Sequence, residues 1–193
     1  MTIENLAGAV SALTSNVFLV RGERPAIVDV GAQFDLVDRL QSLDVAPERV
    51  LITHTHPDHV GNLDDVRDRL GIETVGVDSA SPLVDHSLDD GDRIALGDHT
   101  YEVVHTPGHA PDHLCAFARE PGVLFSGDLV FANGGVGRVD LPGADGDQLR
   151  RSIERVVDLV ADDLGGLYPG HGPAVEAEAM HHLQAARRMA RSL

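Results

Sequence analysis

The sequence contains no lysine and no tryptophan, and it has only one cysteine, Cys115. A single cysteine excludes an internal disulfide framework. No apolar run approaches the roughly 18 residues that a membrane-spanning helix requires, so no membrane partner is expected. The N-terminal stretch carries no basic segment ahead of its apolar residues, unlike a signal or transit peptide. A cytoplasmic location is the resulting expectation.

Basic residues are also scarce relative to acidic ones. The chain has 31 acidic residues against 15 basic ones, which gives a formal net charge of −16. Such a surface repels a phosphate backbone, which argues against a nucleic-acid partner. The acidic residues form either an ordinary solvated coat or an adaptation to very high salt, where the Debye length falls to about 3 Å near 1 M and self-repulsion is screened. The sequence leaves both interpretations open.

The length and patterning favour a layered α/β fold. With 193 residues and 42% hydrophobic content, the chain suits a single domain over residues 1–193, and its oligomeric state is open. Apolar periodicity indicates helices at 34–43, 62–72, 147–161 and 176–192. Short β-rich runs stand at 16–20, 26–30, 49–53, 74–77, 101–106, 113–119 and 122–128. Because strands form hairpins and also alternate with helices, the pattern predicts a sandwich of mixed sheets.

The densest polar motif is "HTHPDH", directly after the strand expected at 49–53. Residues i and i+2 of an extended segment lie on one side, so His54 and His56 can bind the same ion. Pro57 then turns the chain and moves Asp58 and His59 toward a second position. One H-x-H pair can arise by chance among eleven histidines. The full H-x-H-x-D-H pattern indicates a metal site.

Three further polar residues follow expected strands, each beside a glycine. They are His109 in "TPGH", Asp128 in "SGD" and His171 in "PGH". Glycine and proline let the backbone come close to a metal centre and fix the direction in which the side chain leaves it. Each motif alone reads as an ordinary turn. Together with residues 54–59 they supply seven candidate ligands.

These motifs resemble a known family over nearly the whole chain. Asp29 in "VDVG", followed in order by "HTHPDH", "TPGH", "SGD" and "PGH", is similar to the metallo-β-lactamase fold superfamily. Within it, "HTPGHAPDH" and "GDLVFANGGVGRVDLPGAD" look most like the short glyoxalase II-like (hydroxyacylglutathione hydrolase-like) hydrolases. The resemblance implies a four-layer αββα sandwich, two mixed sheets with helices outside.

The resemblance also implies a dinuclear metal centre. One ion would be bound by His54, His56 and His109. The other would be bound by Asp58, His59 and His171, with Asp128 bridging the two. Imidazole ligands suit zinc, with iron or manganese as alternatives.

The implied function is hydrolysis of a small-molecule acyl-thiol or ester by a hydroxide held between two zinc ions, with Asp58 and Asp128 essential for catalysis. One alternative is a persulfide dioxygenase that holds a single iron through His54, His109 and Asp128. Another is a metal-binding protein of this fold without acyl hydrolase activity.

Three more residues have two interpretations each. Arg138 either faces a substrate carboxylate, as the resemblance implies, or pairs with Asp140. Asp29 either hydrogen-bonds the histidine loop or is a plain turn residue. His113 either supports the ligands from behind or is an ordinary structural histidine. The histidines without ligand spacing include His86 and His99, which we expect in an acidic loop over 78–99.

The charge imbalance leads to a first testable prediction. If the acidic surface is adapted to high salt, the free energy of unfolding should rise as sodium chloride increases from about 0 to 3 M, because salt screens the repulsion between carboxylates. Circular dichroism during thermal unfolding across a salt series measures this. A midpoint that does not change with salt would favour the solvated coat instead.

Overall fold

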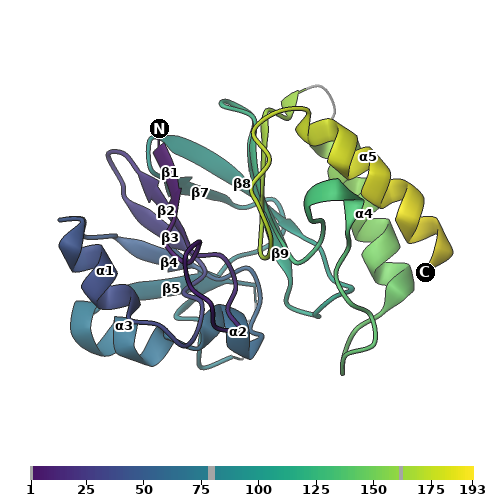
Figure 1. Cartoon of the computed structure of the whole chain (residues 1–193). Helices are drawn as coiled ribbons and strands as arrows, with labels where there is room; N and C mark the ends of the chain where they lie inside the picture. Colours follow the sequence, from purple (N-terminus) through teal and green to yellow (C-terminus); the bar gives the residue numbers. More distant parts are fainter. Residues whose placement is uncertain (1, 78–80, 161–162) are drawn as a thin grey trace. The chain divides into compact units, whose positions relative to one another are not determined.

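The computed structural model describes residues 2–77, 81–160 and 163–193 (Figure 1). The chain divides into two compact units. The first comprises Met1–Leu88 and Ala95–Thr100, and the second comprises Asp89–Ile94 and Tyr101–Leu193. A single domain over residues 1–193 stays a prediction. Within the described ranges, no helix has the length and apolar character needed to cross a membrane.

The first sheet has six strands that lie side by side in chain order. They are β1 (Thr2–Asn5), β2 (Phe18–Arg21), β3 (Ala26–Val28), β4 (Arg49–Leu51), β5 (Glu73–Gly76) and β6 (His86–Ser87). The pairs β1–β2 and β2–β3 are antiparallel, whereas β3 to β6 run parallel, so the sheet is mixed. The β-rich runs predicted at 16–20 and 26–30 are confirmed as β2 and β3, which pair as an antiparallel hairpin.

Helices α1 (Leu36–Ser42) and α3 (Leu63–Leu70) lie next to each other and carry the core of the first unit (Figure 1). Their apolar residues recur at helical spacing, and the buried face packs with strand residues such as Ile27 and Val50. Gly71 ends α3 with a left-handed φ of 63°, as its sequence position predicts. Both predicted helices are therefore confirmed.

A short helix, α2 (Pro57–Val60), is absent from the sequence prediction, which treated Pro57 only as a turn residue. Proline favours the first helical position because its missing N–H would have no intrahelical partner there. The single turn that follows presents Asp58 and His59. The histidine motif therefore consists of a strand end followed by one turn of helix.

The second sheet has five strands in the order β11 (Gly166–Pro169), β10 (Val123–Gly127), β9 (Leu114–Ala118), β8 (His99–His105) and β7 (Arg93–Leu96). Antiparallel β8–β9–β10 continues into a parallel β10–β11 pair. The prediction of two mixed sheets with helices is confirmed. Residues 78–80 of the expected loop over 78–99 lie outside the described residues. The rest of that prediction is wrong in part, because His86 lies in β6 and His99 opens β8, and both strands are completed by pairing with other strands of their sheets.

Helices α4 (Gly146–Val160) and α5 (Ala179–Met189) pack together in the second unit (Figure 1). The predicted helix 147–161 matches α4, apart from residue 161, which lies outside the described residues. The last helix begins three residues later than the predicted residue 176, because Glu178 has a left-handed φ of 53° that is incompatible with a right-handed helix. Two short 3-10 helices, η1 (Ala132–Gly134) and η3 (Ala190–Ser192), complete the unit.

The burial of α4 gives a stability prediction. Ile153 is fully buried among residues of α4, α5 and the second sheet. Replacing it with alanine should lower the free energy of unfolding by about 2–5 kcal/mol, because the substitution leaves a cavity in a packed core. Urea unfolding of I153A measures the loss. The matched control is R151A on the exposed face of the same helix, which should change stability by no more than about 0.5 kcal/mol. Equal stability of the two variants would contradict the packing account.

Candidate metal centre

In the first unit, four candidate ligands come together after β4; we call them the histidine-loop cluster (His54, His56, Asp58 and His59). His54 is buried, and its Nε2 lies 3.1 Å from His56 Nδ1. A ring nitrogen of His59 lies within 4.8 Å of one from His54, and also within 4.8 Å of an Asp58 carboxylate oxygen. The strand end and the turn of α2 thus gather the four side chains that the motif singles out.

The spacing of the His54 and His56 nitrogens fits a shared metal ion. A tetrahedral zinc with Zn–N distances of about 2.0–2.1 Å holds two ring nitrogens about 3.3 Å apart. The 3.1 Å separation of the two nitrogens is close to that value. Imidazole and carboxylate are also the donor types that zinc and iron accept. The donor set of this cluster therefore suits a divalent ion.

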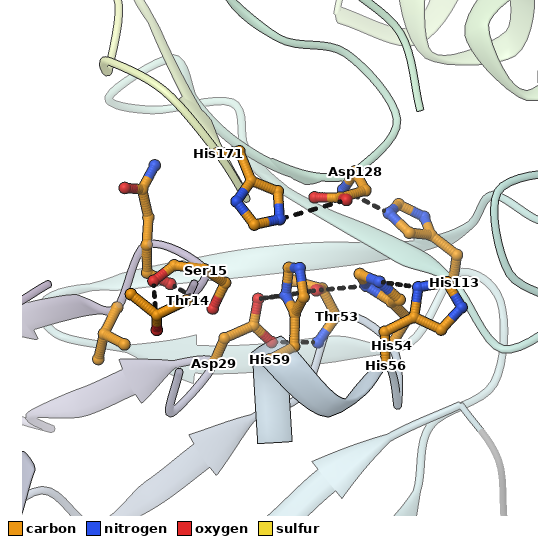
Figure 2. A network of polar contacts seen from close by, with 12 residues as sticks. Thr14, Ser15, Asp29, Thr53, His54, His56, His59, His113, Asp128 and His171 are labelled. Atoms are coloured by element: carbon orange, nitrogen blue, oxygen red, sulfur yellow. Dashed lines mark hydrogen bonds and ion pairs between the residues drawn. The ribbon is translucent and has the colours of Figure 1, made fainter. Parts of the chain in front are cut away.

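Asp29 orients two of these histidines (Figure 2). One of its carboxylate oxygens accepts hydrogen bonds from the Thr53 hydroxyl at 2.8 Å and from His59 Nδ1 at 2.7 Å, and the other accepts from the Thr53 backbone N–H at 2.8 Å. Because the Thr53 hydroxyl donates to Asp29, it accepts from His54 Nδ1 at 3.2 Å. Both rings then carry their proton on Nδ1, which leaves Nε2 as the coordinating atom.

The backbone of Asp29 has a left-handed φ of 57°, which aspartate tolerates better than most residues. Its N–H donates to Leu51 O at 2.9 Å, so the turn after β3 is tied to β4. Asp29 is therefore a turn residue and a hydrogen-bond partner of the histidine loop at the same time. The two interpretations of this residue are compatible.

The loop before β2 also holds the histidine turn. The backbone N–H of Ser15 donates to Asp58 O at 3.0 Å, and Thr14 Oγ1 accepts from the N–H of Ala32 at 2.8 Å. On the other side, the N–H of Val30 donates to His59 O at 3.0 Å. The α2 turn is thus fixed by main-chain contacts from two separate segments.

In the second unit, four residues form what we call the Asp128 cluster (His109, His113, Asp128 and His171). Asp128 Oδ2 lies 3.4 Å from His109 Nε2. The same oxygen lies 3.6 Å from His171 Nε2 (Figure 2). These separations exceed the 2.7–3.2 Å that is usual for an N–H···O hydrogen bond. They match the distance between two ligands of one ion. The arrangement therefore suits a carboxylate that shares metal ions with both histidines.

Main-chain groups orient His109 within this cluster. Its Nδ1 donates to the backbone carbonyl of Arg138 at 2.9 Å, which leaves Nε2 to face Asp128. Gly137 makes this approach feasible, because a Cβ there would lie 2.1 Å from Asp128 O and 2.9 Å from His109 Cβ. A Cβ on Gly108 would likewise lie 2.2 Å from Leu149 N of α4. Gly108 and Gly137 are therefore required by close packing.

The Arg138 side chain forms an ion pair with Asp140, at 2.9 Å from Nε and 2.8 Å from Nη2. Both side chains are largely exposed, and the Arg138 guanidinium lowers the pKa of Asp140. The ion pair that sequence analysis held open is thus present. The contact with His109 comes from the Arg138 carbonyl, which any residue at that position would supply.

Two threonines near the candidate ligands were not predicted from the sequence. Thr53 connects Asp29 to His54, and Thr106 Oγ1 lies 2.8 Å from His113 Nδ1. Both are β-branched residues at the end of strand-like runs, which is sufficient reason for their presence. Their position directly beside a histidine motif was the one available signal. Cys115 is buried, and burial raises the pKa of its thiol to about 12.

Comparison with known proteins relates this geometry to characterised relatives. The Metallo-beta-lactamase superfamily model matches residues 10–171. The hydroxyacylglutathione hydrolase GloC of Haemophilus influenzae is 30% identical over 188 residues, covering 84% of this chain and 88% of GloC. The crystal structure of TTHA1623 in a di-iron-bound form superposes with a TM-score of 0.79 at 29% identity, over 98% of this chain and all of that one.

A more distant structure, ETHE1 from Myxococcus xanthus, has a TM-score of 0.77 at 22% identity over 99% of this chain and 90% of that chain, a likeness of fold. The family model covers most of the sequence and includes all seven candidate ligands. The order of the strands and the histidine motif agree with this match. The chain therefore belongs to the metallo-beta-lactamase superfamily.

Proposed function

We propose that this metal-dependent hydrolase cleaves a thioester or ester of a small molecule, and that its two clusters bind one pair of divalent metal ions. The main support is the spacing of donor atoms within each of the two clusters, which matches that of ligands bound to the same metal ion. The likeness to GloC, which is named a hydroxyacylglutathione hydrolase, supports a thioester as the substrate.

The proposed ligand assignment is the one that the resemblance to the superfamily implies, and each ion would take ligands from both clusters. One ion would be held by His54, His56 and His109, and the other by Asp58, His59 and His171, and Asp128 would contribute to both. Asp128 is suited to the bridge because one of its oxygens faces both His109 and His171. The di-iron-bound form of TTHA1623 supports occupancy by two ions.

When bound, a pair of such ions supplies an activated water at neutral pH and polarises a carbonyl. Three of the candidate histidine ligands keep their ring protons directed away from the proposed metal centre. The Nδ1 protons of His54 and His59 are directed to Thr53 and Asp29, and that of His109 to the Arg138 carbonyl. The two carboxylates, Asp58 and Asp128, contribute negative charge that offsets part of the charge of the ions.

A thioester substrate is compatible with a chain that contains no lysine to serve as a proton donor. A departing thiol has a reference pKa of about 8.5 and leaves as a thiolate with little need of a proton donor. The exposed Arg138 is then available to a substrate carboxylate if its ion pair with Asp140 opens. Opening this exposed ion pair costs little free energy, since such pairs contribute about 0–1 kcal/mol to stability.

One prediction from this proposal concerns the carboxylates. D58A and D128A should each lower thioester hydrolysis by more than about 100-fold, because even partners outside the ligand shell cost 10–100-fold when removed. Turnover of acyl-thioesters, lactones, β-lactams and phosphodiesters by the metal-loaded protein, monitored spectroscopically, measures the loss and ranks the substrates. The control is D158A on the exposed face of α4, which should keep full activity. Full activity of both D58A and D128A would contradict the proposal.

Another prediction from this proposal concerns the metal. The protein should bind two equivalents of zinc by elemental analysis, lose hydrolysis when a chelator removes them, and recover it when zinc returns. Iron and manganese are loaded in parallel. One equivalent of iron with oxygen consumption on a persulfide would instead identify a dioxygenase. Two bound ions without turnover on any acyl substrate would identify a binding protein of this fold.

A further inference from the structure

A chain of hydrogen bonds lies behind Asp128 in the interior of the second unit, and the backbone of residues 126–128 closes it into a ring. It starts at the Asp128 backbone N–H, which donates to His113 Nε2 at 2.9 Å (Figure 2). His113 is completely buried, and its Nδ1 lies 2.8 Å from Thr106 Oγ1. Thr106 Oγ1 lies 3.5 Å from Cys115 Sγ, which in turn lies 3.5 Å from the carbonyl of Ser126. The ring therefore returns to the segment that it left.

The backbone of this segment explains why the ring is needed. Strand β10 ends at Gly127, whose φ of 46° is left-handed, and its register with β11 shifts between Phe125 and Gly127. This change in backbone direction places Asp128 outside the hydrogen-bonded pairing of the sheet. A buried backbone N–H without a partner would cost free energy comparable to a lost hydrogen bond. The His113 imidazole supplies the acceptor that the sheet no longer provides.

The ring also determines where the His113 proton is. A backbone N–H can only donate, so Nε2 must accept and be unprotonated. The imidazole is therefore neutral with its proton on Nδ1, which donates to Thr106. The Thr106 hydroxyl then donates either to Cys115 Sγ or to the His113 carbonyl, each 3.5 Å away. Because burial raises the pKa of the Cys115 thiol to about 12, the thiol is protonated and donates to the Ser126 carbonyl.

We propose that His113 is a positioning residue for Asp128: as the neutral Nδ1–H tautomer it fixes the kinked backbone so that the carboxylate faces His109 and His171. This inference rests on the proposed role of Asp128 as a metal ligand. His113 contacts the main chain of Asp128, while Oδ2 of the same residue lies 3.4 and 3.6 Å from the two histidines. A rotation of the Asp128 backbone would change both distances together.

The first test uses the metal-free protein and needs no activity. In histidine labelled with ¹⁵N, long-range ¹H–¹⁵N spectra distinguish a protonated Nδ1 from a protonated Nε2. We expect His113 to show an unprotonated Nε2 and a slowly exchanging Nδ1 proton, with the Asp128 amide protected from hydrogen exchange. A protonated Nε2, or rapid exchange of the Asp128 amide, would overturn the inference.

The second test compares two variants of similar polarity. In H113Q the amide oxygen lies near the position of Nε2 and can still accept from Asp128, whereas in H113N the shorter side chain reaches only the Thr106 side of the pocket. Zinc affinity, measured by chelator competition, should fall by about 10–100-fold in H113N and be largely retained in H113Q. H181Q, at an exposed histidine of α5, is the control. Thermal unfolding of each variant separates loss of fold from loss of metal.

The outcomes separate the two proposals. Tight binding of two ions by the original protein, with equal affinity in H113N, would overturn the role of His113 and leave the proposed function standing. No metal binding by the original protein would overturn the proposed function, and with it the role of His113 in metal binding. Rescue by H113Q together with the expected tautomer supports the inference.

Discussion

The arrangement of both clusters depends on one property of histidine, the difference between its two ring nitrogens. A neutral imidazole has one protonated nitrogen, so a fixed acceptor for that proton decides which nitrogen is left to coordinate. Asp29 accepts the Nδ1 proton of His59 directly and orients His54 through the Thr53 hydroxyl. The Arg138 carbonyl accepts the Nδ1 proton of His109. One buried carboxylate and one main-chain carbonyl therefore determine the coordinating atoms of three candidate ligands.

This constraint explains much of the surrounding backbone. An acceptor must lie within hydrogen-bond distance of the ring, so segments approach each other more closely than side chains would permit. Gly137 allows the chain to pass against His109 and Asp128, and Asp29 adopts a left-handed φ to aim its carboxylate. Strain of this kind is typical of functional sites, where the surrounding structure holds residues in sparsely populated conformations.

Sequence patterning predicted most of the fold, because its elements have strong local signals. The apolar stripe of α4 and the hairpin of β2 and β3 follow from periodicity and turn residues alone. Strands β6 and β7 could not be found this way, since they are short and their residues gain a partner only from distant strands. The start of α5 was misplaced because nothing local marks Glu178 as left-handed.

The candidate ligands were predictable for a different reason from their supports. Histidine and aspartate are chemically distinctive, and their motifs follow strand ends, whereas Thr53 and Thr106 act through a hydroxyl that any strand threonine has. Arg138 illustrates the same limit. Its guanidinium pairs with Asp140 in solvent, but the group that reaches His109 is a carbonyl that all residues share. A sequence reveals side-chain chemistry, while contacts made by the backbone depend on the path of the chain. The conformation of the segment 135–138 therefore matters more for His109 than the identity of residue 138.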